Sequence, residues 1–432
     1  MKDLHEISLR SRQAYYILSV SPEEQRNQAI LNLSRLLKER FPEISARNRE
    51  DFAAAEAEHL PSPLLHRLVF DEKKLSQTCD GLQSLSVLPD PVGKTTYSEE
   101  ITEGLTLYRV VCPIGVIGVI FESRPDALIQ IASLCIKSGN SVLLKGGREA
   151  IQTNQLLCEC VRNALKEAGL PEDAAQLLET REDVSAMLKE DGLIDLIIPR
   201  GSRQFVQYIM DNSRIPVLGH SDGICHVYID ESADPEMAVA VALDSKAQNV
   251  SVCNAAETIL IHMNIAGTVL PHLYDSLSAA GVEVRGDSAV REIIPCLPAD
   301  EKDWETEYLD YIVSIRTVSS LAEAIEHINR YGSHHTDTIV TRNAECASDF
   351  MKRVDSAGVY WNASTRFADG FVYGFGAEVG IATGKIHARG PMGLEGLTTY
   401  KYKMIGSGNI LADMKNGTRA YTHKSLGQDC PY

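Results

Sequence analysis

The segment from Gly115 to Leu218 constrains the fold more than any other part of the chain, because short apolar runs alternate in it with helical stretches. Strands that alternate with helices pair in parallel and form an open sheet covered by helices on both faces. The chain is therefore predicted to be an α/β protein with a Rossmann-type, doubly wound nucleotide-binding domain. The predicted strands are Gly115–Phe121, Ser141–Lys145, Leu193–Ile198 and Ile215–Leu218, and the helices are Pro125–Ser138, a long helix ending at Ala168, and Arg203–Asn212.

A second α/β series begins at Asp234-Pro235, an N-cap residue followed by a proline at the first helical position. A chain of 432 residues exceeds what one hydrophobic core supports, so we expect two domains with a boundary near residue 233. The first α/β series then falls within 1–233 and the second within 234–396, and a C-terminal strand and tail over 397–432 follow them. The strands expected in the second series are Thr258–His262, Tyr311–Ile315 and Thr338–Thr341, with helices at Leu321–Asn329 and Ala344–Val354.

Two segments rich in Thr and Tyr at a period of two lie outside these series. One is a hairpin over about residues 90–112, and the other is the strand Leu397–Met404. Such strands leave unpaired edges unless another strand covers them. A neighbouring subunit is one source of that strand, so we expect a homo-oligomer, a dimer or a tetramer.

The chain carries 42 basic and 59 acidic side chains, a net charge of −17. This field repels phosphate backbones and anionic lipid surfaces, so nucleic acid and membrane are not expected partners. The N-terminus lacks an apolar signal segment and no apolar run is long enough for a spanning helix, which makes the cytoplasm the expected location. The ten cysteines show no paired CxxC spacing, so no metal site is expected.

Cys253 differs from the other cysteines because it lies in the polar segment Asp244–Thr258, between a predicted helix and a predicted strand. A thiolate is a strong nucleophile toward acyl carbon, and Lys246 or backbone N–H groups nearby would lower the pKa of the thiol. Cys253 is therefore a candidate nucleophile. The alternative is that it only caps the strand.

Two turns suggest a site for a phosphorylated nucleotide. Pro199-Arg-Gly-Ser202 joins a strand to a helix N-terminus, where phosphate oxygens bind, although such turns also use Gly and Ser for geometry alone. Lys145 and Arg148 flank two glycines at the end of an adjacent strand and can bind a ribose and an extra phosphate, which favours NADP over NAD. The Gly-rich stretch 370–380 is either a loop that closes over substrate or a surface connection.

The histidines show no HExxH arrangement, so they are expected to be solvated or to lie in the core. The set considered comprises His220, His226, His262, His334, His335 and His387.

Five blocks of sequence, spread over nearly the whole chain, are distinctive when taken together. The blocks are Cys253-Asn254 with Ala256-Glu-Thr-Ile-Leu-Ile-His262, Phe121-Glu-Ser-Arg-Pro-Asp126, Ile215-Pro-Val-Leu-Gly-His220, Gly223-Ile-Cys-His-Val-Tyr-Ile-Asp230 and Gly384-Lys-Ile-His-Ala-Arg-Gly-Pro-Met-Gly-Leu394. Together they resemble the γ-glutamyl phosphate reductase family of proline biosynthesis, within the aldehyde dehydrogenase superfamily. The resemblance implies an NADP-binding domain over 1–233, a catalytic domain over 234–396, and a C-terminal oligomerisation strand and tail over 397–432.

The resemblance implies an aldehyde-dehydrogenase-like fold with an oligomerisation arm, and it implies roles for individual residues. Cys253 corresponds to the nucleophile, with its backbone N–H and a neighbour such as Asn254 as oxyanion donors. Ser123 stands where oxidising relatives keep an Asn. For the cofactor, Lys145 and Arg148 would face the adenosine ribose and its phosphate, Gly201 and Ser202 the pyrophosphate, and Glu307 the nicotinamide ribose.

One departure indicates the direction of the reaction. Oxidising aldehyde dehydrogenases carry a Glu before a Leu-Gly-Gly turn, which activates water against the thioester, whereas here the turn reads Val217-Leu-Gly-His220. Reduction is therefore expected. Two further departures, Asn249-Val250 before the cysteine and a long tail over 406–432, do not touch the nucleophile.

The function expected from this resemblance is the NADPH-dependent reduction of γ-glutamyl phosphate to glutamate 5-semialdehyde through a thioester on Cys253. The candidates for binding the substrate carboxylate and phosphate are Ser123, Arg124, Arg203, Lys246 and Arg366. Two rival readings are a CoA-acylating aldehyde dehydrogenase and a non-catalytic nucleotide-binding scaffold for a glutamate kinase. A glutamate kinase is also a possible partner of the enzyme itself.

Overall fold

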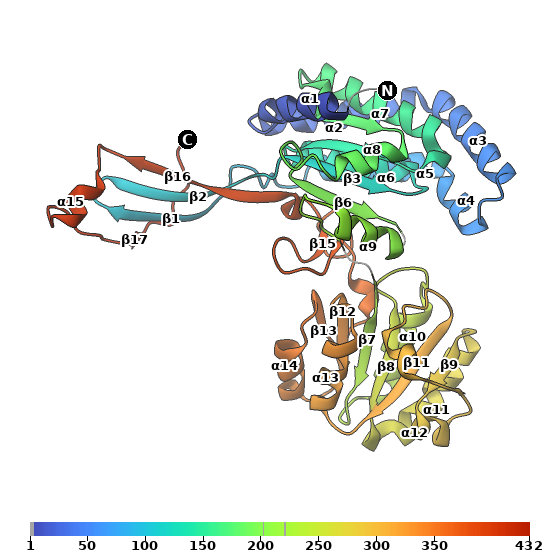
Figure 1. Ribbon diagram of the computed structural model, residues 1–432. Helices are drawn as coiled ribbons and strands as arrows, with labels where there is room; N and C mark the ends of the chain where they lie inside the picture. Colours follow the sequence, from blue (N-terminus) through green and yellow to red (C-terminus); the bar gives the residue numbers. More distant parts are fainter. Residues whose placement is uncertain (1–3, 202, 220–221) are drawn as a thin grey trace. The chain divides into compact units, whose positions relative to one another are not determined.

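The computed structural model describes residues 4–201, 203–219 and 222–432, and its contacts divide the chain into two compact units (Figure 1). Unit 1 comprises Met1–Leu218, Phe375–Gly380 and Met392–Tyr432. Unit 2 comprises Gly219–Gly374 and Ile381–Pro391. Each unit has its own sheet, in agreement with the predicted α/β class.

The division between the units falls at Gly219 and not near residue 233, as the sequence suggested. The reason is that the strand before residue 233 belongs to the sheet of unit 2. β7 (Cys225–Ile229) pairs in parallel with β8 (Ala256–His262) on one side and β12 (Thr336–Val340) on the other. It therefore lies in the middle of the second sheet. The strand expected at Ile215–Leu218 is reduced to an isolated bridge between Ile197 and Val217.

Unit 1 is built on a four-stranded parallel sheet in the order β5-β4-β3-β6. The predicted runs form its central strands: Val116 pairs with Ser141, and Ile117 pairs with Leu196. Every residue of β3 and β4 is buried, as expected for strands covered on both faces. The strands are β3 (Val116–Phe121), β4 (Ser141–Lys145), β5 (Ala175–Leu178) and β6 (Leu196–Arg200).

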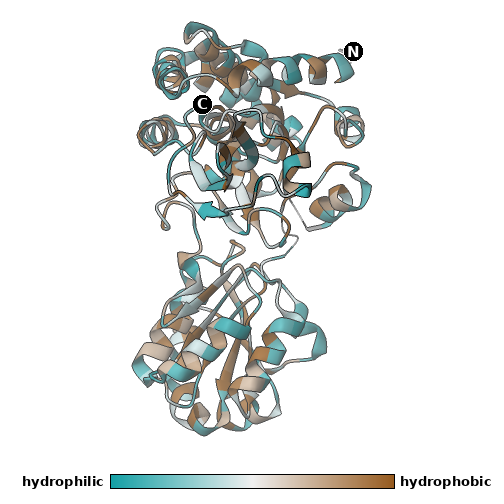
Figure 2. Cartoon of the chain, turned by 90° about the vertical axis from the view of Figure 1, so that its left-hand side faces the viewer, coloured by the Kyte–Doolittle hydropathy of each residue, from teal (hydrophilic) through white to brown (hydrophobic). Residues whose placement is uncertain are grey.

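The helices of unit 1 cover this sheet. α6 is buried along almost its whole length, and α2 packs against both α5 and α7. Figure 2 shows hydrophobic residues along the strands, while the helices carry both hydrophilic and hydrophobic residues. The helices are α1 (Leu4–Leu18), α2 (Glu23–Glu39), α3 (Phe41–Ala57), α4 (Ser62–Leu68), α5 (Glu72–Ser86), α6 (Pro125–Lys137), α7 (Ile151–Glu167), α8 (Arg181–Met187) and α9 (Arg203–Asn212).

The segments rich in Thr and Tyr form an antiparallel arm in the order β16-β2-β1-β17. β1 (Thr95–Thr102) and β2 (Leu105–Pro113) make the predicted hairpin, and β16 (Thr398–Gly406) pairs with β2 along its full length. β17 (Lys424–Ser425) pairs with β1, and α15 (Leu411–Lys415) lies between β16 and β17 in sequence. The C-terminal segment of the same chain thus covers both edges of the hairpin, and the sheet now ends at β16 and β17.

Unit 2 is built on a seven-stranded sheet in the order β10-β9-β11-β8-β7-β12-β13. Helix α10 begins as predicted, because Asp234 accepts a hydrogen bond from the Met237 N–H and Pro235 takes the first helical position. The remaining elements are β9 (Glu283–Gly286), β10 (Leu297–Pro298), β11 (Ile312–Val318), β13 (Gly358–Trp361), α10 (Pro235–Ala247), α11 (Met263–Ala279), α12 (Ser288–Ile293), α13 (Leu321–Tyr331) and α14 (Ala344–Arg353).

Two short strands lie where the chain passes between the units, β14 (Gly380–Ala382) and β15 (Gly390–Met392), and they pair with each other. A helix that is both long and apolar enough to span a bilayer is not found in the described part of the chain.

A buried amide joins three segments of unit 1. Asn140 is fully buried at the end of α6, where its side-chain oxygen accepts from the Gly115 N–H at 2.8 Å. Its amide nitrogen donates to the Leu397 carbonyl oxygen and to Ser138 Oγ, both at 2.8 Å. One side chain therefore fixes the entry to β3 and the start of β16.

We expect Asn140→Ala to lower the free energy of unfolding by about 2–3 kcal/mol, because the substitution leaves a buried N–H and a buried carbonyl without partners. The measurement is the midpoint of thermal unfolding followed by circular dichroism. Asn212→Ala is the control, since Asn212 is exposed at the end of α9 and its loss should change stability by less than about 0.5 kcal/mol. Equal midpoints for the two variants would contradict the assignment.

Candidate active site

Cys253 lies at the amino-terminal edge of the unit 2 sheet, in the loop between α10 and β8. Its sulfur is 3.2 Å from Nε2 of His335, the residue directly before β12. β8 and β12 are the two neighbours of β7, so the loops that precede them meet across the start of that strand. A half-buried thiol and a buried imidazole are thereby placed in direct contact.

The segment before β7 lies tightly against the Cys253 loop. A Cβ atom added at Gly223 would lie 2.1 Å from the Cys253 carbonyl oxygen and 2.4 Å from its Cα, so only glycine fits there. The Cys225 thiol donates to the same Cys253 oxygen at 3.3 Å, and the Gly223 N–H donates to Glu307 Oε1 at 2.9 Å. Glu307, expected at the nicotinamide ribose, is thus held beside the strand that supports Cys253.

Asn254 holds a second loop against Cys253. Its amide nitrogen donates to the Ala368 carbonyl oxygen at 3.0 Å and to that of Arg366 at 3.5 Å, and its own carbonyl accepts from Thr365 Oγ1 at 2.7 Å. Because both bonds of the amide nitrogen go to backbone carbonyls, the expected role of Asn254 as an oxyanion donor does not fit this arrangement. Its side chain is a structural link between two loops of the site.

Lys246 is also placed differently from the expectation that it binds substrate. Its side chain is fully buried, and its ammonium bonds the equally buried Glu257 carboxylate at 2.5 Å. Burial raises the pKa of Glu257 to about 7, against the opposing charge of Lys246, and burial lowers the pKa of Lys246. Glu257 accepts from the Leu309 N–H as well, so the pair supports the segment that carries Glu307.

Arg366 remains a substrate-binding candidate close to the thiol. It lies in the short 3-10 helix η4 (Thr365–Phe367), and its Nε donates to Gln248 Oε1 at 2.9 Å, at the start of the Cys253 loop. Burial lowers the pKa of Arg366, while the negative charges of Asp369 and ionised Cys253 act against that shift. The charges of Arg366 and ionised Cys253 therefore act on each other.

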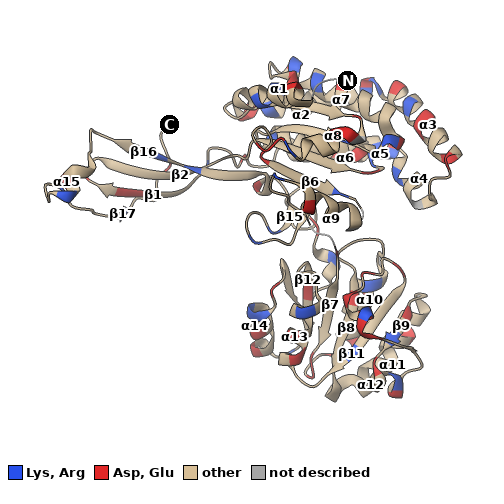
Figure 3. Cartoon of the chain, viewed as in Figure 1, with Lys and Arg blue, Asp and Glu red and all other residues tan. Residues whose placement is uncertain are grey.

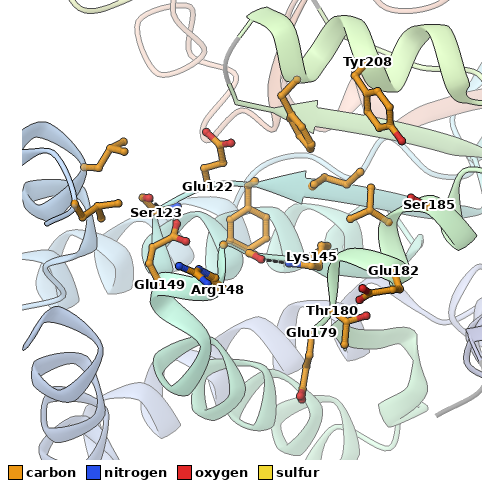
Figure 4. Close-up of a pocket in the computed structure, with 18 residues that line it drawn as sticks. Glu122, Ser123, Lys145, Arg148, Glu149, Glu179, Thr180, Glu182, Ser185 and Tyr208 are labelled. Atoms are coloured by element: carbon orange, nitrogen blue, oxygen red, sulfur yellow. Dashed lines mark hydrogen bonds between the residues drawn. The ribbon is translucent and has the colours of Figure 1, made fainter. Parts of the chain in front are cut away.

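Unit 1 contains a cavity of about 1200 Å³ at the carboxyl ends of β3 and β4 (Figure 4). Ser123, Lys145 and Arg148, three of the predicted site residues, line it together with Gly146 and Gly147. Acidic residues line it too, and acidic and basic residues are interspersed over the helices of this unit (Figure 3). The acidic lining residues are Glu122, Glu149, Glu179 and Glu182.

The two cations of the cavity differ in exposure. Lys145 is buried, with Nζ 2.5 Å from the Gly146 carbonyl oxygen, whereas the Arg148 side chain is 72% exposed and bonds Glu58 at 2.6 Å. Between them the chain makes a tight turn, because a Cβ at Gly147 would lie 1.9 Å from a Glu149 carboxylate oxygen. The backbone of this turn and the side chains of Lys145 and Arg148 therefore lie beside an open cavity. This arrangement suits the binding of a phosphorylated nucleotide.

Ser123 is held at the rim of this cavity in the left-handed region, with φ at 42°. Its N–H and hydroxyl both donate to Glu149 Oε1, at 2.8 and 2.6 Å. Arg124 is exposed at the start of α6 and is not among the lining residues. Burial and the neighbouring Glu149 charge raise the pKa of Glu122.

The second turn is described only in part. Gly201 lies close to Phe205 and to the Glu122 carboxyl, where an added Cβ would be 3.0–3.2 Å from its neighbours. Ser202, expected at the pyrophosphate, lies outside the described residues, as do the side chain of Arg203 and the whole of His220.

His335 is the residue that sequence reasoning missed. We expected the histidines to be solvated or in the core, and His226 fits that description: it is buried and bonds Asp337 at 2.9 Å. His335 is buried too, but its ring reaches the thiol. The two residues are 82 positions apart, and no local motif joins them. Within residues 4–201, 203–219 and 222–432, no three His, Cys, Asp or Glu side chains are grouped to hold a metal ion.

Comparisons with known proteins show the family to which the chain belongs. Residues 3–291 match the aldehyde dehydrogenase family. A protein from Acetivibrio thermocellus named gamma-glutamyl phosphate reductase is 56% identical over 428 residues, 99% of each chain, and one of that name from Pelotomaculum thermopropionicum is 55% identical, covering 99% of this chain and 98% of its own. The crystal structure of gamma-glutamyl phosphate reductase from Thermotoga maritima superposes with a TM-score of 0.93 at 40% identity, covering 95% of this chain and 100% of the other.

We expect Gly223→Ala to lower both stability and the reactivity of Cys253, because the added methyl group overlaps the Cys253 backbone. The measurements are thermal unfolding and the rate of Cys253 alkylation by iodoacetamide. Gly267→Ala is the matched control: this helical glycine has no neighbouring atom within 4 Å of the added Cβ, and the change should stabilise the helix by about 0.5–1 kcal/mol. Similar effects of the two substitutions would refute the close packing.

Proposed function

The chain belongs to the γ-glutamyl phosphate reductase family, and we propose on that basis that it reduces γ-glutamyl phosphate to glutamate 5-semialdehyde and phosphate with NADPH. This reaction is the second step of proline biosynthesis from glutamate. The observation that carries the proposal is Cys253, a half-buried thiol in a loop of unit 2 whose sulfur contacts an imidazole nitrogen.

The chemistry proposed for Cys253 is acyl transfer followed by reduction. Its sulfur attacks the acyl carbon of the substrate, the bond from that carbon to the phosphate oxygen breaks, and a thioester forms on the enzyme. NADPH supplies the hydride that reduces the thioester carbon. The carbon–sulfur bond of the thiohemiacetal then breaks, which releases the aldehyde and regenerates the thiolate.

The environment of Cys253 contrasts with that of cysteines in the interior. Burial raises the pKa of Cys160 to about 11, and burial together with the Asp337 charge raises the pKa of Cys225 well above its usual range. Thiols of that kind keep their proton at neutral pH and are inert. Cys253 is less buried and has an imidazole at its sulfur and a guanidinium close by, which suits a nucleophile.

The fate of the thioester follows from a missing carboxylate. The turn Val217-Leu-Gly-His220 carries no Glu or Asp, so the carboxylate that activates water in hydrolytic aldehyde dehydrogenases is missing from it. A thioester that survives long enough can be reduced by hydride or returned to phosphate. This is the property that a reductase needs and a hydrolytic aldehyde dehydrogenase lacks.

For the cofactor, we propose that Lys145 and Arg148 hold the adenosine ribose and its 2′-phosphate. The glycine turn between them and the cavity beside it fit a nucleotide, and the extra phosphate adds a charge that Arg148 can pair with. Arg148 is exposed and already paired with Glu58, so binding exchanges one ion pair for another. We propose Glu307 at the nicotinamide ribose by the family resemblance.

We further propose that the arm of β1, β2, β16 and β17 joins copies of the chain. β16 lies at the edge of the arm sheet, and Tyr400, Tyr402 and Met404 on it are each more than half exposed. Exposed aromatic and thioether side chains along an edge strand are typical of a surface covered by another strand.

We expect Cys253→Ser to abolish turnover of the semialdehyde with phosphate and NADP, or to reduce it at least about a thousandfold, because a serine hydroxyl ionises far less readily than a thiol and is a poorer nucleophile. The measurement is NADPH absorbance. The nucleotide affinity, followed by fluorescence titration, should be unchanged, since Lys145 and Arg148 are untouched. Turnover close to the wild-type rate would overturn the proposal.

We expect Arg148→Ala to raise the KM for NADPH by about tenfold and to leave the KM for NADH nearly unchanged, because only NADPH has the 2′-phosphate. The measurement is steady-state kinetics with each cofactor. Arg47→Ala is the control, since Arg47 is an ion-paired arginine on α3 that does not line the cavity. An equal increase in the KM for NADPH and for NADH would show that Arg148 does not bind the 2′-phosphate.

A further inference from the structure

We propose that His335 is the base that takes the proton from Cys253 and holds the resulting thiolate as an ion pair. The inference rests on the proposed function, because it concerns how the nucleophile of that reaction is activated. His335 Nε2 and Cys253 Sγ are 3.2 Å apart, a distance suited to direct proton transfer.

The backbone fixes the imidazole in this position. His335 is 1% exposed, and its carbonyl oxygen accepts from the Gly358 N–H at 3.0 Å, where β13 begins beside β12. The side chain is thus confined by the sheet on one side and reaches the thiol on the other. A histidine held in this way keeps its orientation while the sulfur reacts.

The contacts of Nδ1 bear on which nitrogen of the His335 ring carries the hydrogen and which one can accept from the thiol. Nδ1 lies 3.0 Å from Thr336 Oγ1 and 3.7 Å from Cys225 Sγ. The Cys225 thiol keeps its proton, since burial and Asp337 raise its pKa, and it donates that proton to the Cys253 carbonyl oxygen. The Thr336 hydroxyl oxygen can accept a hydrogen from Nδ1, and in that tautomer Nε2 accepts from the Cys253 thiol.

Charged groups surround the pair. Asp337 on β12 and Glu257 on β8 raise the pKa of Cys225, whose sulfur lies 3.7 Å from His335 Nδ1, and each has its own buried partner, His226 and Lys246. Arg366 in η4 places positive charge near the sulfur. Further titratable groups at the site are Cys225 on β7 and Glu307 beside Gly223, and the charges of Asp244 and Asp369 act on Arg366.

The proton is accounted for at each stage. It leaves Cys253 Sγ for His335 Nε2, the sulfur forms its bond to the acyl carbon, and phosphate departs with the electron pair of the carbon–oxygen bond. The imidazolium gives its proton to the departing phosphate. When the aldehyde is released the thiolate is regenerated, and one proton from solvent restores the resting pair, which is the proton that the overall reduction consumes.

The test is the pH dependence of Cys253 alkylation by iodoacetamide, quantified by mass spectrometry of the peptide that contains Cys253. In the wild type we expect the rate to stay within about twofold of its maximum down to pH ~6, because the ion pair keeps the sulfur ionised. In His335→Asn we expect the midpoint to rise toward pH ~8.5, the value of an unassisted thiol, with a loss of about tenfold in rate at pH 6.5.

His334→Asn is the matched control. His334 is the adjacent histidine, its Nδ1 bonds the Asp355 carbonyl oxygen, and its positive φ of 61° is one that Asn tolerates. This variant should keep the wild-type profile. A His335→Asn profile that matches the wild type would overturn the inference, while the proposed function would stand if Cys253→Ser is inactive. Should His335→Asn fail to fold, the wild-type profile alone decides, since a single midpoint near pH 8.5 contradicts the ion pair.

Discussion

The parallel pairing of β7 between β8 and β12 is the constraint on which the site depends. Neighbouring parallel strands begin at the same edge of a sheet, so the segments before them are brought together whatever their distance in sequence. Gly223, Cys253 and His335 each lie shortly before one of these three strands. The contact of the Cys253 thiol with the His335 imidazole is a consequence of strand order. Because Gly223 has no Cβ, the segment before β7 can lie directly against the Cys253 backbone.

Strand order also explains which parts of the account could be predicted from the sequence. Fully buried parallel strands read as continuous apolar runs, so β3, β4, β8 and β12 were found within a few residues of their true bounds. Cys253 was singled out as a candidate because a cysteine in a polar loop differs from one in an apolar string. Both signals are local, and local signals survive in a single sequence.

The parts that were not predicted depend on contacts between distant segments. The sequence suggests that Lys246 is a solvent-exposed cation beside the nucleophile. In the structure it is buried and forms an ion pair with Glu257, which lies on the following strand. The sequence suggests that the Asn254 amide is available as a donor to substrate. In the structure its nitrogen donates to backbone carbonyls of the loop at 366–368. His335 shows no motif with Cys253, and the domain boundary was displaced because β7 belongs to the second sheet. In each case the deciding partner is invisible until the fold is known.

The chain's net charge of −17 makes the local placement of cations important for the proposed reaction, in which both the acyl phosphate and NADPH are anions. Lys145 and Arg148 stand among carboxylates in unit 1, and Arg366 stands beside the thiol in unit 2. In the proposed enzyme these few cations bind the anionic ligands, although the net negative charge of the chain repels them.

The most direct test of the central claim is mass spectrometry of the enzyme after incubation with γ-glutamyl phosphate in the absence of any nicotinamide cofactor. If the sulfur of residue 253 carries the acyl group, a glutamyl adduct should appear on the peptide containing that residue and disappear when NADPH is added. An enzyme that consumes the substrate under turnover conditions but never shows this adduct would contradict the account.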